Sequence, residues 1–235
     1  MTIPLSTLHP YTYEFDAVIT HIAEDGAVEL DTTYFYATGG GQPNDLGVVK
    51  RNDEEFIIKD VRKKDGRIVH FIDRPGLDVG DALHCIIDKD RREKHRRMHT
   101  ATHVLCAVIE KAENTLVTGN QIGAEKTRID FNLENCDAEK IKSYVDEANR
   151  IIARNPTVRK YVTTRDELVK NPHLIKLAAG FPQSVTDVHM IEIVDFDIQP
   201  CGGTHVDALS EIGVLVFEKI ESKGKNNRRV SFTLQ

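Results

Sequence analysis

The sequence lacks three patterns that would assign it to a broad class before any motif is considered. Its four cysteines are scattered and no charged-then-apolar segment opens the chain, so we expect reduced thiols and a cytoplasmic location. No apolar run approaches the roughly 20 residues of a membrane helix, so we expect no membrane partner. A net charge of −6 over 235 residues excludes a uniformly basic nucleic-acid coat protein.

Positive charge is nonetheless concentrated in two stretches. The segment "KDRREKHRR" (89–97) carries six Lys or Arg against two acids, and "EKIESKGKNNRR" (218–229) carries five against two. Basic stretches on an acidic chain favour a protein that binds a polyanion on one face only. A solvated helix face and a polar hairpin tip are the alternative interpretation, which charge alone leaves open.

The first part of the chain consists of short β-branched segments separated by turn residues. Six segments of strand length share this pattern, namely 13–22, 26–31, 46–50, 54–64, 67–73 and 81–88. They predict a small β-barrel or sandwich. Between the second and third lies "YFYATGGGQPNDLG" (34–47), which is too glycine-rich to be a strand interior.

From residue 89 onward the hydrophobic spacing becomes helical. Met98, Thr102, Leu105 and Ile109 are separated by 4, 3 and 4 positions, which predicts a helix over 91–112. Further segments indicate a helix at 137–153 and strands at 157–164, 187–196, 212–222 and 228–234. We therefore predict an α+β fold in which a β-barrel domain (1–90) precedes a domain of helices on an antiparallel sheet (91–235).

Two short motifs each place a pair of metal-binding side chains four positions apart. In "HTATH", His99 and His103 share one face of the predicted helix, about 6 Å apart. In "CGGTH", Cys201 and His205 flank two glycines that let the backbone fold both side chains toward one point. A thiolate with three imidazoles favours zinc over magnesium, calcium or manganese. We expect one zinc ion per chain.

The role of this zinc stays open at the level of spacing. Four protein ligands are the number expected of a closed structural site, whereas catalytic zinc keeps one position for water. The small neighbours Gly202, Gly203, Thr100 and Thr102 leave room for a substrate, which favours an active site. Either motif alone is also compatible with ordinary packing, since histidine pairs often form a polar edge and a single cysteine is usually a small buried hydrophobe.

The two motifs together resemble the signature of the editing domain of alanyl-tRNA synthetase and of the free-standing AlaX editing proteins. The segment "TYFYATGGGQPNDLG" is similar to the glycine-rich motif of the medium-length AlaX type. Two more segments, "TGNQIGAEKTRIDF" and "SEIGVLVFEKIESKGKNNRRVSFTL", resemble the stretch after the histidine helix and the closing hairpin of that family. The four motifs occur in the family's order.

This resemblance implies a barrel followed by the editing domain that alanyl- and threonyl-tRNA synthetases share. The implied activity is hydrolysis of the ester that joins serine, or in some members glycine, to alanine tRNA. The chain has no room for an aminoacylation domain, so we expect a free-standing editing protein with mischarged tRNA as its partner. No protein partner is implied.

The resemblance also implies roles for individual residues. It carries over His99, His103, Cys201 and His205 as metal ligands. Gln121 is expected near the aminoacyl group, Thr33 near a seryl hydroxyl, and Gly40 in a loop whose amides approach the ligand. From their charge we expect Lys223, Lys225, Arg228 and Arg229 to contact phosphates on the closing hairpin.

Each of these roles has an ordinary structural alternative. Gln121 could be a polar strand residue and Gly40 part of a barrel turn. At the level of the whole protein, two rivals remain. One is an RNA-binding module with a purely structural zinc, and the other is a zinc hydrolase of small esters or amides.

Overall fold

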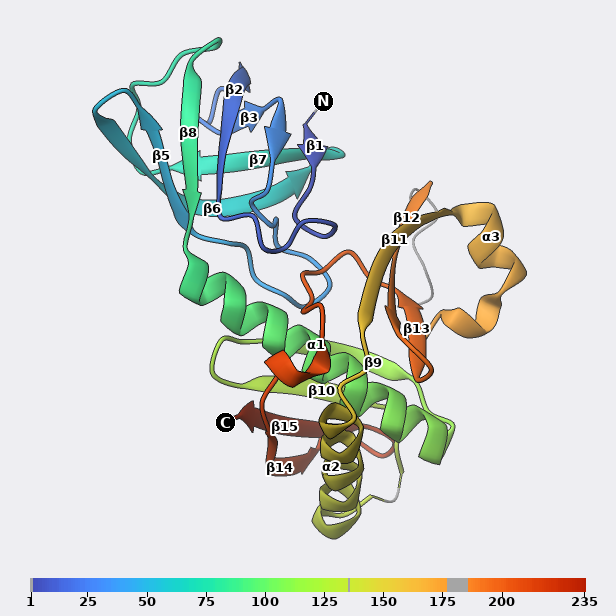
Figure 1. The fold of residues 1–235 in the computed structure, drawn as a ribbon. Coiled ribbons are helices and arrows are strands. Elements are labelled where there is room, and N and C mark those ends of the chain that lie inside the picture. The colour runs from blue at the N-terminus through green and yellow to red at the C-terminus, as the bar shows by residue number, and fades with distance from the viewer. Residues whose placement is uncertain (1, 135, 177–185) are drawn as a thin grey trace. The chain divides into compact units, whose positions relative to one another are not determined.

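The computed structural model describes residues 2–134, 136–176 and 186–235 and divides into two compact units, Met1–Glu93 and Lys94–Gln235. The first unit holds a closed barrel of six strands in the order β2-β3-β7-β6-β5-β8 (Figure 1). These strands are β2 (Glu14–Ile22), β3 (Val28–Leu30), β5 (Gly47–Arg51), β6 (Glu54–Lys64), β7 (Arg67–Ile72) and β8 (Ala82–Ile87). A short parallel pair, β1 (Ile3–Pro4) and β4 (Thr32–Thr33), accompanies the barrel.

The barrel strands form because apolar residues alternate with polar ones. In β2 the side chains of Phe15, Ala17 and Ile19 point into the barrel core while their neighbours are exposed, the period of two that a half-buried strand requires. Strands β6 and β7 are joined by Asp65 and Gly66, both at positive φ (51° and 75°), as a two-residue hairpin turn needs. The predicted barrel is therefore confirmed.

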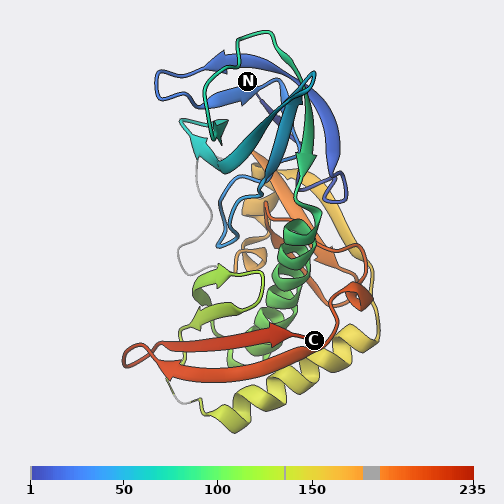
Figure 2. The ribbon, with the colours of Figure 1, turned by 90° about the vertical axis from the view of Figure 1, so that its left-hand side faces the viewer.

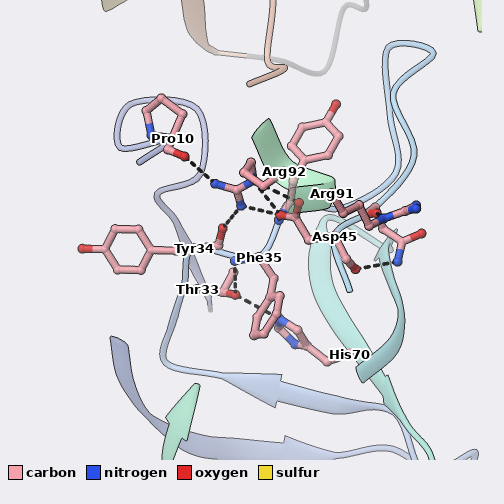
Figure 3. A network of polar contacts seen from close by, with 10 residues as sticks. Pro10, Thr33, Tyr34, Phe35, Asp45, His70, Arg91 and Arg92 are labelled. Atoms are coloured by element: carbon pink, nitrogen blue, oxygen red, sulfur yellow. Dashed lines mark hydrogen bonds and ion pairs between the residues drawn. The ribbon is translucent and has the colours of Figure 1, made fainter. Parts of the chain in front are cut away.

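A buried ion pair anchors the start of helix α1 (Lys89–Glu113) inside the first unit (Figure 3). Both Arg92 and Asp45 have fully buried side chains, and the Arg92 Nε donates to Asp45 Oδ1 at 2.9 Å. The other two guanidinium nitrogens are also bonded, because Nη1 donates to the Pro10 carbonyl at 2.9 Å and Nη2 to the Tyr34 carbonyl at 2.6 Å. The charge is thus paired, and each of the three nitrogens donates a hydrogen bond, the condition under which burial is tolerated.

The second unit combines two antiparallel sheets with helices. One sheet has the strand order β14-β15-β10-β9 and the other β11-β12-β13. Their strands are β9 (Val117–Ile122), β10 (Thr127–Phe131), β11 (Val158–Thr164), β12 (Asp187–Ile193), β13 (Asp197–Pro200), β14 (Leu215–Ser222) and β15 (Arg228–Leu234). The helices after α1 are α2 (Ala138–Ala153) and α3 (Arg165–Lys170), with short 3-10 turns at Pro172–Leu174 and Leu209–Glu211.

Helices α1 and α2 supply one face of the core of the second unit. Buried residues of α1 such as Leu105 and Ile109 pack with Phe131 of β10 and Phe232 of β15. Helix α2 begins at the cap Asp137, whose carboxylate accepts from the Lys140 amide at 2.9 Å. Figure 2 shows α2 running along the hairpin of β14 and β15, which it contacts through β14. The α+β class predicted from the sequence is confirmed.

None of the helices in the described part of the chain combines the length and the apolar character needed to cross a membrane.

The Arg92–Asp45 pair generates the first prediction. Replacement Asp45→Ala leaves a buried guanidinium without its counter-ion, so we expect the free energy of unfolding of the barrel unit to fall by about 3–5 kcal/mol. The control is Asp25→Ala, which removes the exposed pair with Lys64 (3.0 Å) and should change stability little. Urea unfolding followed by circular dichroism measures both. Equal stability of the two variants would contradict the role given to Arg92.

Candidate metal centre

Two segments of the second unit bring together the four predicted metal ligands. His99 and His103 lie one helical turn apart on α1, and Cys201 and His205 lie in the segment that follows β13. This segment is fixed at its start because the Cys201 amide donates to the His189 carbonyl of β12 at 2.9 Å. Nearly a hundred residues separate His103 from Cys201 in sequence, so the two pairs of ligands come together only in the folded unit.

The four donor atoms converge on one small volume. All of them lie within 4.8 Å of one another. The Cys201 Sγ is 3.5 Å from His99 Nε2 and 3.4 Å from His205 Nε2. A tetrahedral zinc site with its usual bond lengths has an S···N separation of about 3.5 Å. These two S···N distances match that ion.

Burial determines the protonation of the histidines. Desolvation lowers the pKa of His103 to about 4, and it lowers the pKa of His99 and of His205 well below the usual value. Neutral imidazoles are the form that ligates a metal. His103 Nδ1 is also buried and has no hydrogen-bond partner among the described residues, so the site contains a ring nitrogen that the protein itself leaves unsatisfied.

The thiol is held differently. Burial raises the pKa of Cys201 to about 11, and the Gly203 amide, 3.4 Å from Sγ, opposes this rise. A cation must therefore displace the proton from sulfur on binding. Cys201 as a whole residue is half-buried, while the three histidines are buried. The donor set of one sulfur and three nitrogens suits zinc.

Gln121 lies on β9, exposed on the outer face of the four-stranded sheet. Its Oε1 accepts from Arg128 Nε at 2.8 Å. Gln121 lines a hollow of about 290 Å³ together with residues of three other strands and a turn, namely Lys126, Arg128, Lys219, Glu221, Arg229 and Ser231. The structure thus brings Gln121 and Arg229, two of the predicted site residues, to one surface. The role of Gln121 near an aminoacyl group stays a prediction.

The four basic residues of the closing hairpin differ in how they are engaged. Arg229 forms a paired contact with Asp130 (2.7 and 2.8 Å), and Arg228 donates to the hairpin carbonyls of Gly224 and Asn227. Lys223 lies 3.7 Å from the Glu221 carboxylate. Among the described residues, Lys225 has no ion-pair partner. The contact of these four residues with phosphates stays a prediction. The two lysines are less engaged in contacts within the protein than the two arginines.

Thr33 and Gly40 lie in the barrel unit. The Thr33 hydroxyl is fully buried and is 3.0 Å from Nε2 of His70 (Figure 3). His70 Nδ1 lies 3.1 Å from the Val28 carbonyl, which only accepts, so Nδ1 carries the proton and Thr33 donates to Nε2. The hydroxyl also accepts from the Phe35 amide at 3.1 Å. Its predicted contact with a seryl side chain is untested, but its one proton is already used.

Gly40 occupies the tip of a tight hairpin. Gly39 and Gln42 exchange two backbone hydrogen bonds of 3.1 and 2.9 Å, and the two residues between them have positive φ, 57° for Gly40 and 83° for Gly41. This geometry is the two-residue turn for which glycine is preferred. Both tip residues are exposed. The approach of their amides to a ligand stays a prediction.

Sequence reasoning missed two polar groups that belong to this unit. Thr100, considered only for its small size, contacts His205 directly. Lys176 bridges Asp197 and Glu110, and the Glu110 contact measures 2.9 Å. After burial, the charges of Asp197 and Lys176 are the next influences on the pKa of His103. No spacing rule could have found the group of Lys176, Glu110 and Asp197, because these residues are far apart in sequence. Glu110 lies on α1, Asp197 on β13, and Lys176 in the loop after the 3-10 turn Pro172–Leu174.

Two family models match separate parts of the chain. Residues 6–91 match the model described as tRNA synthetases class II (A). Residues 188–231 match the model described as threonyl and alanyl tRNA synthetase second additional domain. The second match contains Cys201 and His205, so half of the ligand set lies inside a domain defined in synthetases.

Similar proteins cover the whole chain. The alanyl-tRNA editing protein AlaX-M of Methanosarcina acetivorans is 42% identical over 100% of this chain and 99% of its own length. That of Saccharolobus solfataricus is 37% identical, with complete coverage of both chains. The alanine–tRNA ligase of Pyrococcus furiosus is 33% identical over 95% of this chain, which spans 25% of that enzyme. The chain belongs to the AlaX family of alanyl-tRNA editing proteins, as the motifs predicted.

Proposed function

We propose that the chain is a trans-editing deacylase that hydrolyses the aminoacyl ester of alanine tRNA mischarged with serine or glycine. The observation that supports this most strongly is the convergence of His99, His103, Cys201 and His205 in a chain whose full-length relatives are named alanyl-tRNA editing proteins. An aminoacyl ester is already activated. The protein therefore needs to place the 3′-terminal adenosine, admit water to the carbonyl and stabilise the developing oxyanion.

The four side chains would hold one zinc ion in this proposal. A bound zinc would supply a fixed positive charge that shapes the pocket and stabilises the negative charge developing on the carbonyl oxygen of the ester. Gly202, which is exposed and adjacent to Cys201, leaves this side of the site unobstructed, since a Cβ added at Gly202 would meet nothing within 4 Å. A substrate approaching from that side needs no movement of a bulky side chain.

The outer face of the four-stranded sheet is the surface we propose for the tRNA acceptor end. One row of paired residues crosses all four strands, with Gln121 opposite Arg128, Arg128 opposite Ser231, and Ser231 opposite Lys219. The guanidinium, the ammonium and the amide of this row provide donors for phosphate and ribose oxygens, while Ser231 between them is buried. These side chains also line the hollow described above, so a ligand could enter between them.

Selectivity follows from hydrogen bonding in the editing pocket. A synthetase pocket for alanine discriminates poorly against glycine, which is smaller, and against serine, which adds only a hydroxyl. A pocket that hydrogen-bonds the seryl hydroxyl reverses the comparison, because alanine leaves its polar groups unpaired at a cost of about 1–3 kcal/mol. Alanine tRNA that carries its correct amino acid is then spared.

One observation favours a second candidate. Four protein ligands are the number of a closed structural zinc site, and the chain would then be an RNA-binding module without hydrolytic activity. Both candidates bind zinc and tRNA. They differ only in the fate of the ester.

The experiment that tests the proposal follows the loss of amino acid from seryl-, glycyl- and alanyl-tRNA for alanine, with the zinc-loaded chain. We expect release of serine to exceed release of alanine by about 10-fold or more, since 1.4 kcal/mol of discrimination is a factor of ten. Gln121→Ala should slow release while zinc content is unchanged, because this exposed side chain belongs neither to the hydrophobic core nor to the four metal-binding side chains. If all three esters survive although zinc is bound, the chain is the RNA-binding module instead.

The proposed phosphate contacts have their own test. Replacing both Lys223 and Lys225 by Gln should weaken tRNA binding and make its salt dependence shallower, by up to about 0.9 per lost contact in the slope of log K against log salt. Turnover of bound substrate should change little. The matched control is Lys170→Gln on α3, whose ammonium pairs with Glu167 at 2.6 Å on a helix outside this sheet. An unchanged slope in the double variant would make the hairpin a polar tip only.

A further inference from the structure

Thr100 lies between the two metal-binding segments and contacts both. It follows His99 on α1, and its side chain is fully buried. Its Oγ1 is 3.0 Å from the Arg96 carbonyl, 3.1 Å from His205 Nδ1 and 3.2 Å from the Val206 amide nitrogen. One hydroxyl therefore contacts both parts of the metal site. It meets one carbonyl on the helix of His99 and His103, and two nitrogens on the segment of Cys201 and His205.

The proton positions in this group follow from what each atom is able to do. A carbonyl only accepts and an amide N–H only donates, so the single Thr100 hydrogen points to Arg96 O and one lone pair accepts from Val206 N–H. The other lone pair faces His205 Nδ1. That contact is a hydrogen bond only if Nδ1 carries a hydrogen and donates it. All three contacts are then satisfied without a buried clash between lone pairs.

We propose that Thr100 is a positioning residue that holds His205 in the Nδ1-protonated tautomer, so that its Nε2 lone pair is directed at the metal ion. The inference rests on the metal site of the proposed function. It is supported by the direction of the other ring nitrogen, because His205 Nε2 lies 3.4 Å from the Cys201 Sγ, inside the ligand cluster. Metal-ligating histidines generally donate their second ring N–H to such a partner, which fixes ring orientation and ligand basicity.

A neighbouring threonine separates this role from ordinary helix packing. Thr102 is also buried on α1, and its Oγ1 donates to the Met98 carbonyl at 2.7 Å, four residues back. Thr100 makes the same contact to the carbonyl four residues before it. Only Thr100 adds bonds to the segment of Cys201 and His205. The two residues therefore share residue type, helix, burial and backbone bond, and they differ in the contact that carries the proposal.

Zinc affinity of the full chain is the readout, measured by competition with a chromophoric chelator. Thr100→Val keeps the shape of the side chain but removes the acceptor for His205 Nδ1, and we expect zinc to bind roughly 10–100-fold more weakly. Thr100→Ser retains the hydroxyl and should restore affinity close to that of the parent. Thr102→Val is the control and should also bind zinc as the parent does.

A measurement on the unaltered chain makes the test independent of any variant that fails to fold. In the zinc-loaded parent, nitrogen-15 NMR of the histidine rings should show His205 protonated at Nδ1 and metal-bound at Nε2. Ligation through Nδ1, or zinc affinity of Thr100→Val equal to that of the parent, overturns the inference and leaves the metal site standing. A parent chain that binds no zinc overturns both.

Discussion

The site depends on one constraint, namely that three imidazoles and one thiol share a volume in which all donor atoms lie within 4.8 Å. Burial lowers the pKa of all three histidines, so they are neutral near pH 7 and do not repel one another as cations. The same burial leaves His103 Nδ1 without a partner among the described residues. The cluster therefore consists of desolvated polar atoms, one of which lacks a hydrogen-bond partner in the described part of the chain. A divalent cation compensates the free-energy cost of burying them, because it accepts the lone pairs of the neutral imidazoles.

The surrounding elements keep the two ligand segments in place. Helix α1 places His99 and His103 on one face and buries its apolar side against the sheet, so the helix cannot rotate this face away without disrupting the core. The second segment is pinned through the Cys201 amide at one end. At its other end, Arg97 of α1 donates to the Ile212 carbonyl at 2.8 and 3.1 Å. Rigid elements on both sides are what a precise metal geometry requires.

The sequence predicted the regular elements well where hydrophobic periodicity was strong. The six barrel segments and the helices over 91–112 and 137–153 correspond to strands and helices of the structure, since alternating or helical spacing reflects a one-sided core directly. Strands β9 and β10 were not predicted, because "TGNQIGAEKTRIDF" is rich in glycine and charge and contributes only three buried apolar side chains, Ile122, Ile129 and Phe131. Packing against α1 and β15, which the sequence does not display, makes them strands.

The same distinction holds for the candidate site. The metal ligands were accessible to sequence reasoning because their type and spacing carry chemical meaning in each half. The Thr100 contact and the Arg92–Asp45 pair were not, since each depends on a partner 47 or more positions away and on the burial of both groups. Hydrogen-bond partners of this kind are set by tertiary structure alone. The bond between the Thr33 hydroxyl and His70 is another such partner, 37 positions away. The contact of Thr33 with a seryl side chain stays a prediction.

X-ray absorption at the zinc edge of the zinc-loaded chain, together with its zinc content, tests the central claim most directly. The account predicts one zinc per chain with one sulfur at about 2.3 Å and three nitrogens at about 2.0–2.1 Å. Cys201→Ser should remove the sulfur shell alone, because the three histidines remain. A parent spectrum with no sulfur neighbour, or with two or more, would contradict the claim that His99, His103, Cys201 and His205 bind the ion together.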